Sequence, residues 1–192
     1  MLKPLLYFIA AMAIATVPAS ALTVTFDFES GPNGPVLFFS ESGVDLTVTA
    51  QGPGGPTNVS QGDNGLGVAG GPEAGRLADG ETLFLNFSAP VRILSFVFFE
   101  GGNQDEFVGI NGGAPLTIPG PGGNQNTIDV AAAGLTGFGF AIDGLSPAGP
   151  GNRGVRLLGL TAEVIPLPAS AVLLLAGLGA LALPRYRRAR AA

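Results

Sequence analysis

Residues 81–99 read ETLFLNFSAPVRILSFVFF, and this stretch decides the fold class. Leu83, Leu85 and Phe87 recur at every second position, which is the period of a strand with one face in the core. Residues 91–99 are almost wholly apolar and predict a central strand that is buried on both faces. The stretch therefore predicts two strands and no helix.

The same period of two continues outward through residues 22–164. Further strands are predicted at residues 22–28, 44–48, 107–110, 127–130, 135–142 and 155–164. In one of them, Phe138, Phe140 and Ile142 are expected on one face. Gly/Pro-rich turns separate the strands, as at residues 52–56 and 119–123. This pattern predicts an all-β domain, a β-sandwich with a jelly-roll topology as the preferred form.

The composition excludes several kinds of site. The 192 residues include no cysteine and no histidine, so disulfides, thiolate nucleophiles, zinc fingers and histidine-based catalysis are excluded. Residues 22–164 contain no lysine, which removes Ser–Lys and Schiff-base schemes. No Gly-Gly pair has the following helix and lysine of a phosphate loop. We therefore expect no enzyme activity.

Charge is distributed unevenly along the chain. Five of its nine basic residues lie in the two terminal segments, whereas all 14 acidic residues lie in residues 22–164. Four basic residues against 14 acidic ones give this central part a net charge of −10. Nucleic acid and anionic lipid are therefore not expected partners, because phosphate binding needs clustered Lys and Arg. The acidic balance favours calcium binding or simple solubility outside the cytoplasm.

Residues 1–21 have the three parts of a signal peptide. Lys3 is the positive start, residues 5–17 are apolar, and Ala19 and Ala21 form an A-x-A site that predicts cleavage before Leu22. The alternative is a retained anchor, but the apolar run is shorter than the ~20 residues of a membrane span. We expect a removable signal helix and export through the cytoplasmic membrane.

Residues 165–192 form a second addressing segment. A proline-containing motif precedes an uncharged apolar run at residues 169–183, and a basic end follows. The motif is Ile165, Pro166, Leu167, Pro168 and Ala169, and the basic end contains Arg185, Arg187, Arg188 and Arg190. Positive residues stay cytoplasmic, so a hydrophobic helix here points the preceding domain outward. A plain C-terminal membrane anchor is the alternative.

This tail resembles the PEP-CTERM class of sorting signals, and most of all its VPLPA-CTERM variant, with Ile165 in place of valine. The resemblance implies processing by an exosortase, a membrane cysteine protease of Gram-negative bacteria that is expected to act as a transpeptidase. It implies a cut near the proline motif, followed by release or transfer to another surface component, often alongside exopolysaccharide production. It covers about 28 residues and concerns sorting, not the activity of the domain.

The domain itself carries a looser resemblance. Gly65-Leu66-Gly67-Val68, followed by the E-x-L-x-L-x-F pattern of residues 81–87 and an apolar strand, is similar to a pattern of PEP-CTERM surface proteins. There GLGV forms a turn before the first of the two strands. This similarity implies a jelly-roll-like sandwich and no particular chemistry.

Calcium is the candidate cofactor, because carboxylates from loops are ligands of hard cations. The candidate ligands lie in or beside predicted loops: Asp63, Asp79, Glu81, Asp105 and Glu106. We also expect Asp27 or Glu29 of the first strand to meet Glu163 of the last. The EF-hand pattern is absent, and the alternative is that these are solvated surface carboxylates.

Carbohydrate is the candidate ligand of an exported acidic sandwich. However, the chain has no Trp, and its two tyrosines, Tyr7 and Tyr186, lie in the addressing segments. Phe84, Phe96 and Phe98 fall on the second face of their strands, where we expect a loop or second layer to cover them. Two functions remain: a structural or adhesive protein of the cell surface or extracellular matrix, with exopolysaccharide as a candidate partner, or a calcium-dependent, lectin-like module.

Changing both Pro166 and Pro168 to alanine is expected to block tail processing in a host that carries the exosortase, because the tail then lacks its proline motif. Mass spectrometry of the intact and processed chain measures this. Normal trimming of the altered chain would show that residues 165–192 are not a sorting signal.

Overall fold

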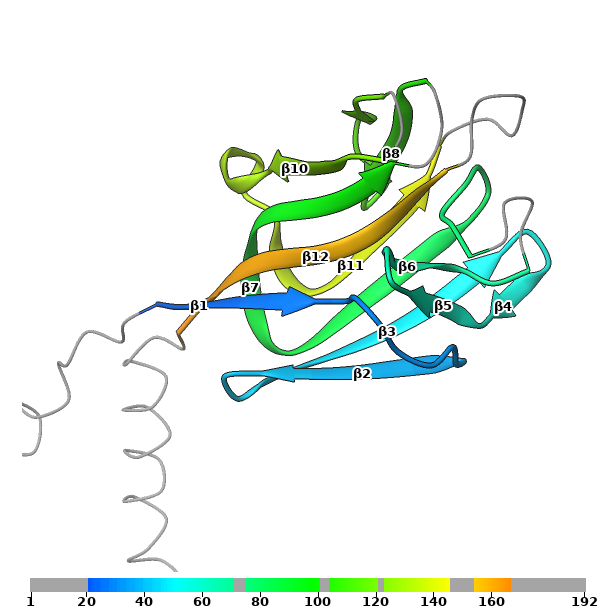
Figure 1. Ribbon diagram of the computed structural model, residues 1–192. Helices are drawn as coiled ribbons and strands as arrows, with labels where there is room; N and C mark the ends of the chain where they lie inside the picture. Colours follow the sequence, from blue (N-terminus) through cyan, green and yellow to red (C-terminus); the bar gives the residue numbers. More distant parts are fainter. Residues whose placement is uncertain (1–20, 71–74, 101–103, 121–122, 146–153, 167–192) are drawn as a thin grey trace, which may run out of the picture. The chain divides into compact units, whose positions relative to one another are not determined.

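A computed structural model describes residues 21–70, 75–100, 104–120, 123–145 and 154–166 (Figure 1). Leu22–Ile165 forms one compact unit. The strands are β1 (Leu22–Asp27), β2 (Val36–Glu41), β3 (Val44–Gly52), β4 (Gly55–Thr57), β5 (Val59–Gly62), β6 (Gly65–Val68), β7 (Thr82–Glu100), β8 (Glu106–Ile110), β9 (Leu116–Ile118), β10 (Gln125–Asp129), β11 (Thr136–Gly144) and β12 (Val155–Val164). Apart from a 3-10 turn at Ala131–Ala133, the described part of the chain is strand, turn or irregular, so the all-β prediction is confirmed.

The two terminal helices expected from the sequence lie in residues 1–20 and 167–192, which are outside the described ones. Within the part of the chain that the structure does describe, no helix has the length and hydropathy of a membrane span.

Strand β7 joins the two halves of the sheet. Where the sequence predicts two strands, the structure has a single strand of 19 residues that bends in its middle (Figure 1). Its first half pairs antiparallel with β3 and β11, and its second half pairs antiparallel with β12 and β10. The ladders of β3 and β12 stop at Phe87 and Val91, and Pro90, which has no N–H to donate, lies in the gap between them.

The bend makes one curled antiparallel sheet face itself. The half with β2, β3 and the start of β7 packs on the half with β1 and β12, as the phenyl rings show. Phe26 of β1 lies 5.9 Å from Phe87 of β7, and Phe28 lies 4.8 Å from Phe39 of β2, between ring centroids. The architecture is therefore sandwich-like, with one core between the two halves.

The core takes alternate residues of each strand. Leu83 and Leu85 of β7 are fully buried, while Asn86, their outward neighbour, is exposed. In the second half, Phe96 and Phe98 are also fully buried and their rings lie 5.9 Å apart. The outward side of this half stays partly exposed, so the prediction of burial on both faces is wrong. One extra residue near Leu94, opposite the Thr161/Ala162 irregularity of β12, shifts the alternation and turns both rings inward.

The GLGV segment is a strand and not the turn that the resemblance implies. It forms β6, which pairs with β5 and β12. Its glycines allow close backbone contact, because a Cβ at Gly67 would lie 2.2 Å from the carbonyl oxygen of Gly75. At Gly65, which has a φ of +95°, a Cβ would lie 2.3 Å from the carbonyl oxygen of Leu157.

Strand β11 also departs from its predicted pattern. Phe140 and Ile142 are buried as expected, but Phe138 is 59 % exposed. A register shift between Gly137 and Gly139 accounts for the difference, since it places Phe138 out of step with the other two.

Leu85→Ala is expected to lower the free energy of unfolding by about 2–5 kcal/mol, because it leaves a cavity in the shared core. The matched control is Asn86→Ala, one residue further along the same strand on the exposed side, which should stay within about 0.5 kcal/mol. Urea denaturation of both variants measures the difference. Equal losses would contradict this assignment of the inner and outer sides of β7.

Candidate functional site

The candidate calcium ligands do not gather in the structure. Asp63 accepts a hydrogen bond from the Ser30 hydroxyl at 3.4 Å, and Asp105 accepts one from the Gly120 N–H at 2.8 Å. Asp79 lies in a turn that bridges to Gly144. Within the described ranges, no three acidic side chains are grouped so as to hold a metal ion. The described residues therefore offer turn-forming carboxylates and no preformed cation site.

Two of the five candidates are buried instead of facing solvent in loops. Glu81 is 1 % exposed and Glu106 fully buried, the latter at the start of β8 opposite Ile118. Glu100, at the end of β7, is also fully buried, although the sequence reasoning did not single it out. Its inward position follows from the alternation with Phe96 and Phe98. This alternation is not visible in the sequence, because residues 91–99 are almost wholly apolar.

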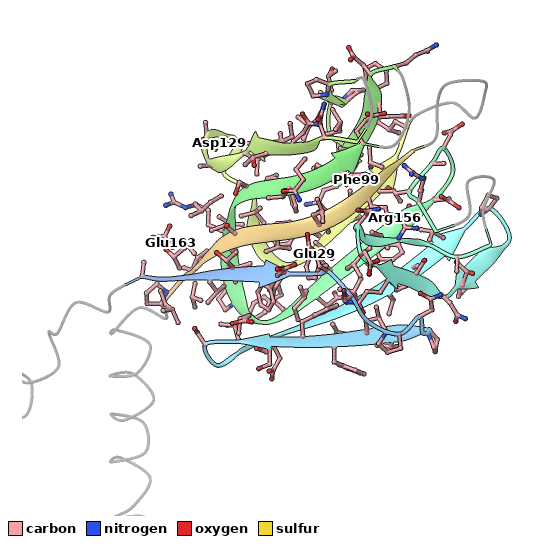
Figure 2. The ribbon with its side chains drawn as sticks, in the orientation of Figure 1. Glu29, Phe99, Asp129, Arg156 and Glu163 are labelled. Carbon is pink, nitrogen blue, oxygen red and sulfur yellow. The ribbon has the colours of Figure 1, made fainter. Side chains whose placement is uncertain are left out.

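The first and last strands are neighbours, but their acids do not meet. Strand β1 pairs along its whole length with the second part of β12, with Asp27 opposite Gly159 and Thr23 opposite Glu163. Glu163 forms a salt bridge with Arg92 of β7 (Figure 2). The charge of Glu163 is therefore neutralised by an arginine of a neighbouring strand, and the expected meeting with Asp27 or Glu29 does not occur.

Glu81 has an environment unlike that of an exposed carboxylate. One carboxyl oxygen accepts a hydrogen bond from the Ala78 N–H at 2.8 Å, and the other has no hydrogen-bond partner among the described residues. Burial raises the pKa of Glu81 above its usual value, and the Ala78 hydrogen bond opposes this only in part. The group is best understood as a buried carboxyl that closes the turn before β7.

An open aromatic surface lies on the outer side of β2, β3 and the first half of β7. Phe38 of β2 is 77 % exposed, the largest value among the exposed large hydrophobic residues in the described ranges. The ladders place it opposite Thr47 of β3, which is itself opposite Asn86 of β7. These side chains line an open hollow of about 520 Å³, together with Ser40 and Asp45. We call this surface the Phe38 face.

A second hollow of about 400 Å³ continues the same side of the sheet. Its lining includes Thr49, Gln51 and Phe84. Thr49 lies opposite Phe84 in the ladder, next to the row of Thr47 and Asn86. Phe84 is therefore half-exposed, and no loop or second layer among the described residues buries it, contrary to expectation. Phe96 and Phe98 are buried, but on the core side of the sheet and not on the second face that the sequence predicted.

The sequence reasoning missed the Phe38 face because it predicted no strand at residues 36–41. The signal was present in residues 36–41, VLFFSE, which begin with four apolar residues and lie between Gly34-Pro35 and Ser42-Gly43. Its period is disturbed because Phe39 is also half-buried, against Phe28.

No protein-family model matches this chain, and no curated protein matches it either. The resemblance of residues 165–192 to PEP-CTERM tails therefore rests on their own sequence pattern.

Glu81→Gln is expected to stabilise the protein at neutral pH and to flatten its dependence on pH. Because the folded pKa is raised, the folded state holds the proton more tightly than the unfolded state. Stability is therefore lost as pH rises from about 4.5 through the folded pKa. Glutamine stays neutral and keeps an oxygen for the Ala78 N–H.

Urea denaturation between about pH 4 and pH 8 measures this effect. Glu41→Gln is the control, since it removes an exposed carboxylate from β2. A gain in stability from Glu81→Gln that is the same at both ends of the pH range would contradict the raised pKa.

Proposed function

We propose that this chain is an exported bacterial surface protein with an adhesive or structural role. A signal peptide is removed before Leu22, and residues 165–192 tether the domain to the cytoplasmic membrane until an exosortase-type enzyme processes them. The protein then reaches the cell surface or the extracellular space. The support for sorting is the order of proline motif, apolar run and arginine cluster.

The arrangement of the domain's own ends suits such a tether. Leu22 pairs with Val164, so the start of β1 and the end of β12 lie side by side. The opposite end of β12, at Val155, lies roughly 30 Å away at the rise of a strand. Attachment at Val164 therefore leaves the other end of β12, at Val155, away from the point of attachment.

The adhesive role rests on one observation, the exposed ring of Phe38. A phenyl group that stays in water forgoes the stabilisation of burial, and it stands here between hydroxyl and amide side chains. Sugars offer both a C–H face for stacking and hydroxyls for hydrogen bonds. The Phe38 face therefore suits a neutral stretch of exopolysaccharide.

A lectin-like, carbohydrate-binding module is the second candidate, and the same face favours it. The calcium dependence of that candidate stays a prediction, since the described residues group no three carboxylates around a cation position. The structure has a curled antiparallel sheet. The connection of its strands as a jelly roll belongs to the proposal.

Phe38→Ala is expected to weaken binding of exopolysaccharide by about tenfold, because it removes the stacking surface. The full chain is tested in an exopolysaccharide pull-down and on a glycan array, with calcium and then with a chelator. Phe38→Trp keeps an aromatic plane and should retain binding. Phe38→Leu keeps apolar area without the ring and should lose it.

Binding that Phe38→Ala leaves unchanged would exclude the Phe38 face as the adhesive surface. Loss of binding on chelation would support the lectin-like candidate. No binding by the unaltered chain in either condition would remove the carbohydrate role and leave a structural one.

A further inference from the structure

Two arginines of the domain are charged neighbours and form no salt bridge with an acidic side chain among the described residues. Arg76 precedes β7 and Arg156 lies in β12, and each is a charged neighbour of the other. Arg92 forms a salt bridge to Glu163, but neither Arg76 nor Arg156 forms one with any carboxylate in the described ranges. This is unexpected in a domain that carries 14 acidic and four basic residues.

Both arginines donate to main-chain carbonyl oxygens. Arg156 donates from Nη1 to the carbonyl oxygen of Gly65 at 3.4 Å, and Arg76 donates from Nη1 to that of Gly154 at 3.3 Å. A guanidinium carries five N–H donors, and each of these contacts uses one of them. Both bonds are long for a charged donor, whose hydrogen bonds are usually about 2.7–2.9 Å.

A hydroxyl group lines the same space (Figure 2 labels Arg156). A Cβ built on Gly75 would lie 2.7 Å from Arg156 Nη2 and 2.9 Å from Ser60 Oγ. Ser60, in β5, is 8 % exposed. The lack of a side chain at Gly75 therefore leaves a small space beside Arg156 Nη2 and Ser60 Oγ.

The electrostatics of this space favour an anion. Both arginines are half-buried, which weakens their hydration. Burial, followed by the charge of Arg76, lowers the pKa of Arg156. An oxyanion beside Arg156 Nη2 would offset the repulsion from Arg76 and accept charged hydrogen bonds.

We propose that Arg76, Arg156 and Ser60 form an oxyanion-binding site that takes the carboxylate or sulfate substituent of an otherwise neutral saccharide. The net charge of −10 repels a polymer with an anion on every residue, so the matching ligand carries isolated anionic groups. The saccharide part rests on the proposed function, whereas the anion site stands on the arginines alone.

The anion site is tested first with inorganic sulfate on the full chain, at constant ionic strength set with chloride. Sulfate should bind saturably by calorimetry and raise the melting temperature with its concentration. Arg156→Gln and Arg76→Gln should each weaken sulfate binding by about tenfold or more, because each removes charged hydrogen bonds. Arg92→Gln is the matched control, with the same loss of charge and unchanged sulfate affinity.

Arg156→Lys separates binding from folding, since it keeps the charge but loses the planar fork, and it should bind sulfate more weakly than the unaltered chain. Failure of sulfate to bind, or equal affinity in the unaltered chain and in Arg76→Gln, would overturn the site. In that case the arginines only clamp β12 to the turns at Gly65 and Gly154.

The source of the anion is tested with methyl glucuronide, its neutral counterpart methyl glucoside, and sulfate side by side. Tighter binding of the glucuronide than of either other ligand supports the saccharide assignment, and binding of sulfate alone overturns it. Phe38→Ala should keep its sulfate affinity, so that failure of the Phe38 face and failure of the anion site give different results.

Discussion

The bend of β7 is the constraint on which the rest of the fold depends. One strand supplies inward side chains to both halves of the sheet, so the two halves cannot be placed independently. Leu83 and Leu85 face the core before the bend and Phe96 and Phe98 face it after the bend. A shift of one residue in either half would turn these side chains outward, and burial of apolar area fixes the register on both sides.

The use of inward positions for packing decides where a binding site can lie. The chain lacks disulfides, so its inward positions are committed to packing, and even Glu81 is buried among them. The outer side of the sheet and the strand ends are left for recognition. Phe38 and the pair Arg76 and Arg156 are two places in the described part of the domain that differ from a plain solvated surface, one by exposing a ring and the other by bringing two positive charges near each other.

The sequence predicted the fold class because side-chain alternation is a local property of each strand. It placed β1, β8, β10, β11 and β12 within a few residues. It missed β2 because the half-buried Phe39 disturbs its alternation, and it read β6 as a turn because that segment is rich in glycine. Both strands nevertheless pair with a neighbour in the chain, β2 with β3 and β6 with β5. For the candidate site, the sequence identified acidic residues but not whether their side chains point into the core or into solvent. Glu106 turns inward through the register of β8, and Glu81 turns inward in the turn before β7. Arg76 is a charged neighbour of Arg156 although 80 positions of sequence separate them, which no local pattern reports.

Turns alone do not explain the high glycine content of the domain, because some glycines are required for close backbone packing. A Cβ at Gly144 would lie 2.1 Å from the carbonyl oxygen of Ala78, and one at Gly67 would lie 2.2 Å from that of Gly75. These contacts hold the segment from Gly75 to Ala78 against β6 and β11, which brings Arg76 beside β12. Backbone packing that only glycine permits thus places one arginine next to the other. The glycines that permit this close backbone packing therefore also place the positive charge of Arg76 near that of Arg156.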